Sequence, residues 1–362
     1  MIHIVFELLL LFLFFLDILI FIGLLYISSV RQKPVSFTPD TETPTIVILP
    51  CRGIDYDMEQ NLASLKDQDH RNFEILAVVD SEEDSAVELL RRFKIKYIIS
   101  EKGTGSGKVS AISTAIRKDS GLHRYTVIAD SDILAPRNWL SSLVSPLSKS
   151  ENGLSTTFPF FRPVGGFWSK VKMVWGFVGL GMMESTITRF GWGGSLAFRN
   201  DLLTEEDLKY FSSHVSDDIA LTKISKKKGL KIAYVPEAHP EVLSPDSFSA
   251  FMEWSNRQTV LSVSSSKNVI RYGLLFYGST IFLFLTSFVI TLEINYLFGF
   301  LFLPIVVNSA RSSYRAPGHR ISGFFIQFLI PFIYLSNLVH GGRMKTISWR
   351  GNNYDLMKEF DP

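Results

Sequence analysis

The sequence Tyr-Thr-Val-Ile-Ala-Asp-Ser-Asp at residues 125–132 decides the fold of this chain. Its apolar, largely β-branched first part predicts a short strand buried in a parallel sheet. Asp130 and Asp132 follow this strand, and side chains at the carboxyl edge of an open α/β sheet line its ligand site. Two carboxylates at this spacing can hold one divalent cation, with water and substrate phosphates as its other ligands. The alternative for the same residues is an Asx turn that caps the next helix.

Residues 40–262 alternate between strand and helix patterns, which predicts an α/β fold with a mostly parallel sheet and flanking helices. The expected strands are residues 45–50, 73–79, 96–99 and 126–129, and the expected helices are residues 58–68, 85–93 and 108–118. Three of these strands lead into Pro50, Asp80 and Asp130. Because the carboxyl ends of parallel strands lie along one edge, we expect these residues to share a ligand site.

The glycine-rich segment 103–108 precedes the last of these helices. It is not a phosphate-binding P-loop, because Lys102 stands where that motif needs Gly and Val109 where it needs Ser or Thr. The glycines predict a turn before the helix. Lys108 can still direct a cation toward an anionic ligand.

Two polar segments further along the chain each allow two interpretations. Ser216 is either the N-cap of a helix that opens with Asp217 and Asp218, or part of a site in which a carboxylate acts as general base. Arg257 is either a snorkelling residue near the membrane or a clamp on a diphosphate leaving group.

Composition bounds the class of protein. The hydrophobic fraction is 46% and the mean hydropathy is +0.19, with the apolar residues concentrated at the two ends of the chain. A net charge of +2 gives no general attraction to nucleic acid, so we expect no nucleic-acid partner. Cys51 is the lone cysteine, which rules out an intrachain disulfide and suits a reducing compartment.

The amino-terminal segment predicts an integral membrane protein. Residues 2–29 are almost entirely apolar and long enough to cross a bilayer. Without a basic segment before them or a small-residue cleavage site after them, residues 1–30 are expected to be an uncleaved anchor. Arg31 and Lys33 follow at once, so the positive-inside rule places the 40–262 domain in the cytoplasm.

The carboxyl-terminal region, residues 270–340, contains three further apolar stretches, at residues 272–292, 294–309 and 321–340. Simple counting of crossings puts the following tail, residues 341–362, outside. The tail is basic, which argues for the inside, through Arg343, Lys345 and Arg350. Pro331 interrupts the last stretch, which is therefore either a full crossing or a re-entrant element.

Taken in order, these segments resemble the family 2 glycosyltransferases of GT-A fold, and within them the ceramide glucosyltransferase-like branch. The resemblance covers residues 45–262 and the layout of the terminal membrane segments. Asp80 falls where the family has its nucleotide-contacting Asp, and residues 128–132 look like the metal-binding DxD motif. Residues 193–199 look like the glycine-rich loop beside the sugar.

The acid pair Asp217 and Asp218 looks like the family's Glu/Asp-Asp, whose second acid is the catalytic base. Residues 254–258 occupy the place of the (Q/R)xxRW motif, but they depart from it. Trp254 replaces the Gln or Arg and Gln258 replaces the Trp, so only Arg257 is retained. In processive polysaccharide synthases that Trp supports the growing chain, so its loss weakens that assignment.

The resemblance implies two catalytic residues, Asp218 and Arg257, and a Mg²⁺ or Mn²⁺ ion at Asp130 and Asp132. The donor-binding residues that it implies are Pro50, Asp80, Lys108, Asp130, Ser131, Gly194, Asp217 and Trp254.

The activity that the resemblance implies is that of a membrane-bound inverting hexosyltransferase. It would move one sugar, glucose, from UDP-glucose to a hydroxyl of a membrane lipid such as a ceramide. Two other functions stay open: a processive polysaccharide synthase, and a non-catalytic membrane protein that binds nucleotide sugars. The apolar segment 160–178 is either an interfacial helix that guides the lipid or an ordinary core helix.

Overall fold

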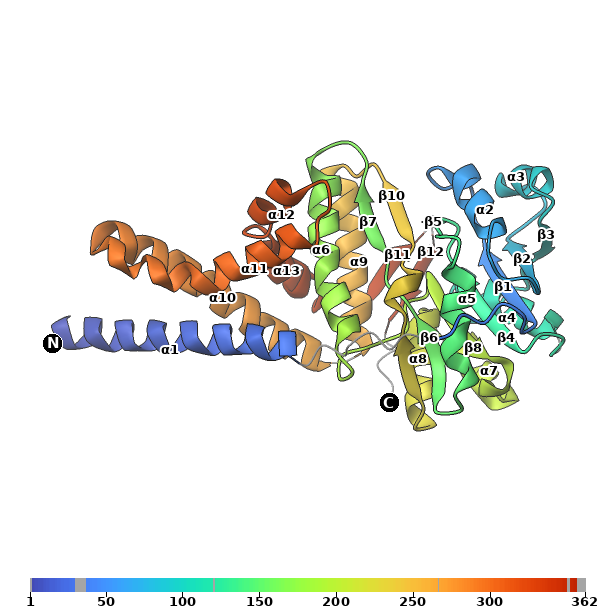
Figure 1. The fold of residues 1–362 in the computed structure, drawn as a ribbon, viewed down its shortest axis with the longest axis horizontal. Coiled ribbons are helices and arrows are strands. Elements are labelled where there is room, and N and C mark those ends of the chain that lie inside the picture. Colours follow the sequence, from blue (N-terminus) through green and yellow to red (C-terminus); the bar gives the residue numbers. More distant parts are fainter. Residues whose placement is uncertain (1, 30–36, 120, 266, 350–351, 357–362) are drawn as a thin grey trace. The chain divides into compact units, whose positions relative to one another are not determined.

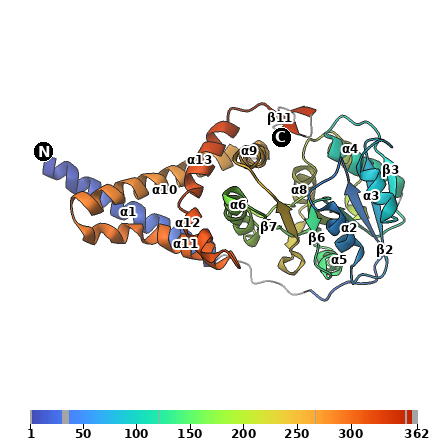
Figure 2. The same cartoon turned by 90° about the horizontal axis from the view of Figure 1, so that it is seen from above.

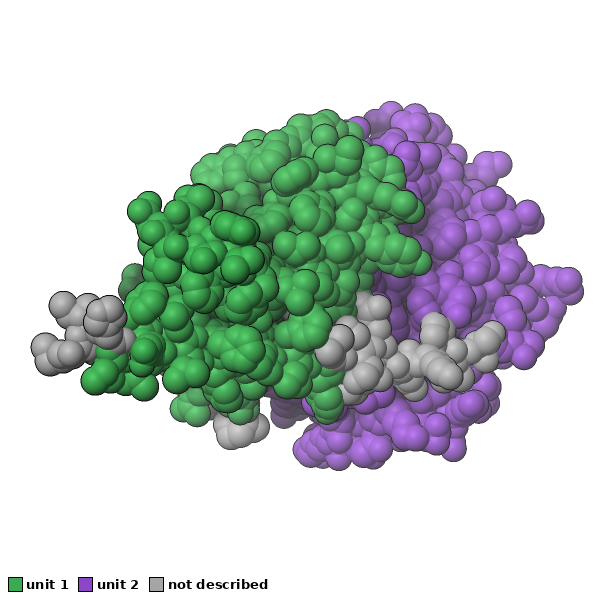
Figure 3. Space-filling view, turned by 60° about the vertical axis from the view of Figure 1, so that its left-hand side comes forward, with its two compact units in different colours: residues 1–31, 163–178, 245–347 green, residues 32–162, 179–244, 348–362 purple. Residues whose placement is uncertain are grey.

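The computed structural model describes residues 2–29, 37–119, 121–265, 267–349 and 352–356. The chain divides into two compact units, which Figure 3 colours separately. The helical unit contains residues 1–31, 163–178 and 245–347, and the sheet unit contains residues 32–162, 179–244 and 348–362. Each unit is therefore built from segments that are far apart in the sequence.

The sheet unit is built on a seven-stranded sheet (Figures 1 and 2). In spatial order its strands are β3 (Lys96–Ile99), β2 (Phe73–Val79), β1 (Thr45–Pro50), β4 (Tyr125–Ala129), β8 (Ser195–Arg199), β6 (Asn152–Thr156) and β9 (Lys231–Tyr234). The pairs among the first four are parallel, and so is the pair of β6 and β9. Only β8 runs antiparallel to both neighbours. The prediction of a mostly parallel sheet is confirmed.

Helices and shorter elements complete the sheet unit. They are α2 (Met58–Lys66), α3 (Ala86–Arg92), α4 (Gly107–Asp119), α5 (Trp139–Val144), η1 (Ser145–Ser148), η2 (Asn200–Leu202), α7 (Glu205–Ser212), α8 (Asp217–Lys227) and η3 (Pro236–Ala238). A second sheet has three strands in the order β5 (Ile133–Leu134), β10 (Glu241–Ser244) and β7 (Phe160–Pro163).

The core of the sheet unit explains why its central strands are continuously apolar. Ile46 and Ile48 of β1 join one hydrophobic cluster with residues of α4, α7 and α8, such as Ile112 and Phe211. The intervening Val47 and its neighbours on the opposite face are equally buried. Since both faces are covered, β1 has no solvent side and needs no polar alternation.

The helical unit collects the apolar ends of the chain. Its helices are α1 (Ile2–Ser29), the first part of α6 (Phe167–Glu184), α9 (Phe248–Ser265), α10 (Lys267–Glu293), η4 (Tyr296–Phe302), α11 (Leu303–Tyr314), α12 (Arg320–Ile326) and α13 (Ile330–Gly341). Leu13, Leu16 and Ile20 of α1 pack against Leu283 and Ile290 of α10. Many of the other apolar side chains of these two helices are exposed, as expected for surfaces that face lipid.

Among the residues that the structure describes, α1 and α10 are long and apolar enough to cross a membrane. Helices α12 and α13 count as a third span only if taken together, and they meet at a bend of 54°. The predicted stretch at 294–309 is divided between η4 and α11, so it contains no single helix of sufficient length. Pro331 stands in the first turn of α13, where its missing N–H costs little.

Segment 160–178 was predicted to be either an interfacial or a core helix. In the structure its residues from Phe167 onward begin α6, and Val171, Met173 and Val174 are almost completely buried. Trp175 stacks on Tyr334 of α13, with 4.8 Å between the ring centroids. This part of α6 is a core helix of the helical unit.

Candidate active site

Three of the predicted site segments meet along one edge of the main sheet. In the register, Pro50 of β1 pairs with Val78 of β2, and Ile48 of β1 pairs with Ile128 of β4. The parallel strands therefore end side by side, as predicted. Across this edge the Nε atom of Arg52 lies 3.4 Å from Oδ2 of Asp80, which is an exposed ion pair. The edge thus holds Pro50, Asp80 and the segment that begins at Asp130.

Lys108, in the first turn of α4, contacts two other predicted site residues and a neighbour of the predicted residue Gly194. Its Nζ atom lies 2.6 Å from Oδ1 of Asp130 and 3.4 Å from Oδ2 of Asp217. It also donates a hydrogen bond of 3.2 Å to the carbonyl oxygen of Gly193. The Lys108 side chain is only 12% exposed and that of Asp217 only 6%. Residues from α4, β4, the glycine-rich loop and α8 therefore form one cluster.

Burial and the neighbouring charges shift the pKa values of the three ionisable groups in this cluster. Burial alone would lower the pKa of Lys108, but Asp130 and Asp217 outweigh it and raise that pKa well above its usual value. Burial raises the pKa values of Asp130 and Asp217, and the Lys108 ammonium opposes that rise. Lys108 is therefore a permanent cation that faces two carboxyl groups.

Asp218 begins α8 beside Asp217 and is held by three donors. The Ser216 hydroxyl donates to it, as do the backbone amides of Ile219, at 2.8 Å, and Gly193, at 3.3 Å. Ser216 is the N-cap residue, but its side chain bonds Asp218 instead of capping the helix. The carboxylate of Asp218 is consequently oriented and still partly exposed.

Sequence reasoning missed two residues that shape the DxD segment. The Ser131 hydroxyl donates to Oδ2 of Asp55 at 2.5 Å, and Asn61 donates to the Ser131 carbonyl oxygen at 3.1 Å. The amide of Asp130 donates to the carbonyl oxygen of Gly194 at 3.1 Å. Asp80 directly follows β2, whereas Asp55 lies in the longer segment between β1 and α2, so a search of the whole segment after each strand would have been needed to find it.

The residues at this edge fit a divalent cation. Within the described part of the chain, no group of three or more His, Cys, Asp or Glu side chains could hold a metal ion. A metal ion at this edge would therefore need ligands from water or substrate as well. Asp130 and Asp132 offer the carboxylate oxygens that Mg²⁺ and Mn²⁺ prefer, and Mg²⁺ usually takes its other ligands from water and phosphate. Oδ2 of Asp217 is buried, and its contact with the Lys108 ammonium is a long one of 3.4 Å, so this oxygen keeps acceptor capacity for a second cation.

Arg257 and Trp254 lie on α9 and belong to the helical unit. The Trp254 ring packs edge-on against Trp175 with centroids 4.9 Å apart, and Nζ of Lys172 lies 4.7 Å from its centre. Lys172 in turn pairs with Asp246 at 3.2 Å, and both side chains are 7% exposed. Trp254 is therefore a packing residue of its unit, and the predicted donor contacts of Trp254 and Arg257 stay predictions.

Comparison with known proteins agrees with the sequence-based resemblance. The profile of glycosyl transferase family 21 matches residues 13–360. Ceramide glucosyltransferase 1 of Caenorhabditis elegans is 23% identical over 386 residues, which covers 93% of this chain and 78% of the relative. These matches confirm the predicted kinship with the ceramide glucosyltransferase-like branch.

Among solved structures, the mannosyltransferase PcManGT of Pyrobaculum calidifontis, in complex with GDP-Man and Mn²⁺, has a TM-score of 0.52. It is 17% identical, and the match covers 91% of this chain and 97% of that one. At this identity the likeness shows the fold alone. It confirms the predicted GT-A fold.

Proposed function

Because the chain belongs to glycosyl transferase family 21, we propose that it transfers one glucose from UDP-glucose to a hydroxyl of a ceramide-like membrane lipid. The observation that carries this proposal is the cluster of Lys108, Asp130 and Asp217 beside Asp218 at the carboxyl edge of the sheet. A fixed cation, carboxylates that can share a metal ion and an oriented acid are the groups that transfer from a nucleoside diphosphate requires.

The donor half of the site is proposed to hold the nucleotide and its diphosphate. Asp80, at the end of β2, contacts the base or ribose, while Asp130 and Asp132 hold the metal ion. When bound, Mg²⁺ or Mn²⁺ neutralises the diphosphate and so makes it a better leaving group. Lys108 adds a fixed positive charge in a largely buried position, where electrostatic stabilisation is strongest. Arg257 adds a second cation to the diphosphate.

Asp218 is proposed to be the general base. It takes the proton of the acceptor hydroxyl, whose oxygen then attacks the anomeric carbon on the face opposite the leaving diphosphate. The configuration of that carbon is inverted. The amides of Ile219 and Gly193 hold the carboxylate before the substrate arrives, which reduces the reorganisation that proton transfer requires.

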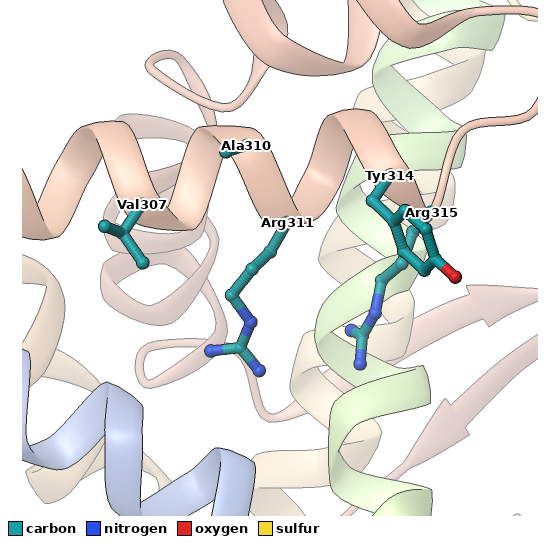
Figure 4. A pocket seen from close by; sticks show the side chains of 5 residues that line it. All are labelled: Val307, Ala310, Arg311, Tyr314 and Arg315. Atoms are coloured by element: carbon teal, nitrogen blue, oxygen red, sulfur yellow. The ribbon is translucent and has the colours of Figure 1, made fainter.

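The acceptor is proposed to be a membrane lipid, since the domain lies between membrane segments in the sequence. Arg311 and Arg315 project from the same side of α11 and, with Val307, Ala310 and Tyr314, line a pocket of about 340 Å³ (Figure 4). Two arginines at the end of a membrane element support a cytoplasmic position for that end, as do Arg31 and Lys33 after α1. We infer that the sheet unit works in the cytoplasm.

The test is incubation of the purified chain with labelled UDP-sugars, Mn²⁺ and extracted membrane lipids. One defined glycolipid formed from UDP-glucose supports the proposal. A ladder of polymers would instead indicate a processive synthase, and no product with any donor would indicate a non-catalytic binder. The variant Asp218→Asn is the control, because it should bind donor and form no more than traces of product.

A further inference from the structure

The carboxyl-terminal tail returns to the sheet unit after the last membrane helix. From Ser348 onward the chain belongs to that unit, although the preceding residues belong to the helical unit. The tail forms a two-stranded sheet of β11 (Thr346–Trp349) and β12 (Asn352–Asp355). Leu356, directly after β12, is completely buried. The tail is therefore packed against the protein at Leu356.

One side chain of β12 reaches the start of α4, the helix that carries Lys108. The backbone amide of Gly107 donates a hydrogen bond of 3.2 Å to the phenol oxygen of Tyr354. The side-chain amide of Asn352 donates to the same oxygen, also at 3.2 Å. A phenol oxygen has two acceptor positions, so these two donors hold it in one place.

The Gly107 amide is one that the helix cannot satisfy itself. Gly107 is the first residue of α4, and the first four amides of a helix have no carbonyl partner within it. Tyr354 supplies an acceptor 247 positions away in the sequence. A Cβ atom on residue 107 would lie 3.7 Å from the phenol oxygen, so tail and helix start are in close contact.

The next residue along α4 is Lys108, whose ammonium must reach Asp130, Asp217 and the Gly193 carbonyl together. Such a three-way contact depends on where the backbone of the first turn lies. A misplacement of an ångström at a charged site is enough to lose much of its effect. A group that holds the backbone of Gly107 in place therefore also helps to hold the ammonium of Lys108 in place.

We propose that Tyr354 is a positioning residue of the donor site, and that strand β12 supports that site. Tyr354 holds the start of α4, and through it Lys108, in the arrangement that receives the diphosphate of the nucleotide sugar. The identity of the ligand in this inference rests on the proposed function. The contact between Tyr354 and Gly107 is independent of that function.

The first test compares two variants. Tyr354→Phe keeps the aromatic ring and loses the oxygen that accepts from Gly107. Asn352→Ala keeps that oxygen and removes the second donor that holds it in place. Loss of one hydrogen bond predicts a KM for UDP-glucose about five- to tenfold higher in Tyr354→Phe, with kcat within about twofold. Asn352→Ala should shift KM in the same direction by less. Tyr97→Phe is the matched control, because it also removes a hydrogen-bonded phenol of the sheet unit, on the exposed strand β3.

The second test measures amide hydrogen exchange in the peptide that covers residues 103–110. Exchange should be faster in Tyr354→Phe than in the wild type and unchanged in Tyr97→Phe. If the wild type transfers glucose but Tyr354→Phe keeps its donor KM, the positioning role is wrong. If the wild type transfers no sugar, the proposed function fails instead, and the exchange rate decides whether Tyr354 holds Gly107. Equal exchange in wild type and Tyr354→Phe would refute the contact.

Discussion

The ammonium nitrogen of Lys108 lies 2.6 Å from Oδ1 of Asp130, an ion pair that joins the first turn of α4 to the end of β4. Asp217 approaches the same ammonium at 3.4 Å. One cation thus faces two carboxyl groups, and the cluster can accept a further positive charge. A metal ion that arrives with an anionic diphosphate would meet this demand without leaving excess charge in the site.

Replacing Lys108 by Met should destabilise the folded sheet unit. Breaking a buried ion pair leaves an uncompensated charge, and because the Asp130 side chain is 32% exposed we expect a loss of about 3 kcal/mol, the lower end of the usual range. Denaturant unfolding in detergent measures the change. Lys96→Met is the control, since its pair with Glu74 is exposed and should contribute less than about 1 kcal/mol. Equal losses in the two variants would contradict a buried pair.

Replacing Asp218 by Asn should leave donor binding intact and lower turnover by roughly 10²–10⁴-fold, the usual effect of removing a general base. Asn keeps one oxygen for the Ile219 amide and loses only the longer bond from the Gly193 amide to the other oxygen, so the fold should survive. Single-turnover kinetics at saturating UDP-glucose provide the measurement. Asp201→Asn, which alters the exposed acid of an ion pair with Arg199, should keep full turnover. Wild-type turnover in Asp218→Asn would rule out the base.

Replacing Asp132 by Asn should uncouple donor binding from the metal. Calorimetric titration of wild-type protein with UDP-glucose should show weaker binding once EDTA removes Mn²⁺, because the metal neutralises the diphosphate. In Asp132→Asn the affinity should be low with or without Mn²⁺. Asp80→Asn distinguishes the roles: its affinity should fall but still respond to Mn²⁺. A strong Mn²⁺ response in Asp132→Asn would exclude this residue as a ligand.

His239 should make the sheet unit less stable as the pH falls. Burial lowers the pKa of His239 to about 4 from the usual 6.5, and its Nε2 atom lies 2.6 Å from the Tyr234 hydroxyl. Between these two values the unfolded chain binds a proton that the folded chain does not, so stability is lost as the pH falls from about 6.5 toward 4. The total effect is up to roughly 3 kcal/mol.

Unfolding measured at several pH values between 7.5 and 5 tests this expectation. In His239→Gln the decline below pH 6.5 should be shallower than in the wild type, because Gln has no proton to gain. His340→Gln, which changes an exposed histidine, serves as the control for the substitution itself. Identical slopes in wild type and His239→Gln would show that another group is responsible.

Local pattern was enough to predict the first half of the main sheet. The strands predicted at residues 45–50, 73–79 and 96–99 have those same bounds in the structure, because each is a short apolar run between clear breaks. By contrast, residues 193–199 were predicted only as a glycine-rich loop, yet Ser195–Arg199 is strand β8. Its place depends on pairing with β4 and β6, which are distant in the sequence.

The site was predictable as a set of candidates, but not as a set of contacts. Asp130, Asp217 and Lys108 were each singled out from their own segments, yet no local pattern says that one ammonium contacts both acids. Trp254 occupies the first position of the arginine motif, where it replaces the Gln or Arg, and its packing on Trp175 depends on a helix about 80 residues earlier. Tyr354 carried no signal at all, because its partner Gly107 is 247 positions away.

The hydrogen bond between Gly107 and Tyr354 also limits how the polypeptide threads the bilayer. Both residues belong to the sheet unit, so the chain must re-emerge on the face from which it entered between Ser244 and Ser348. An even number of passages is therefore required in this interval. If α10 makes one passage, the bent α12–α13 pair is the other candidate span that the described residues offer in this interval, and it would make the return.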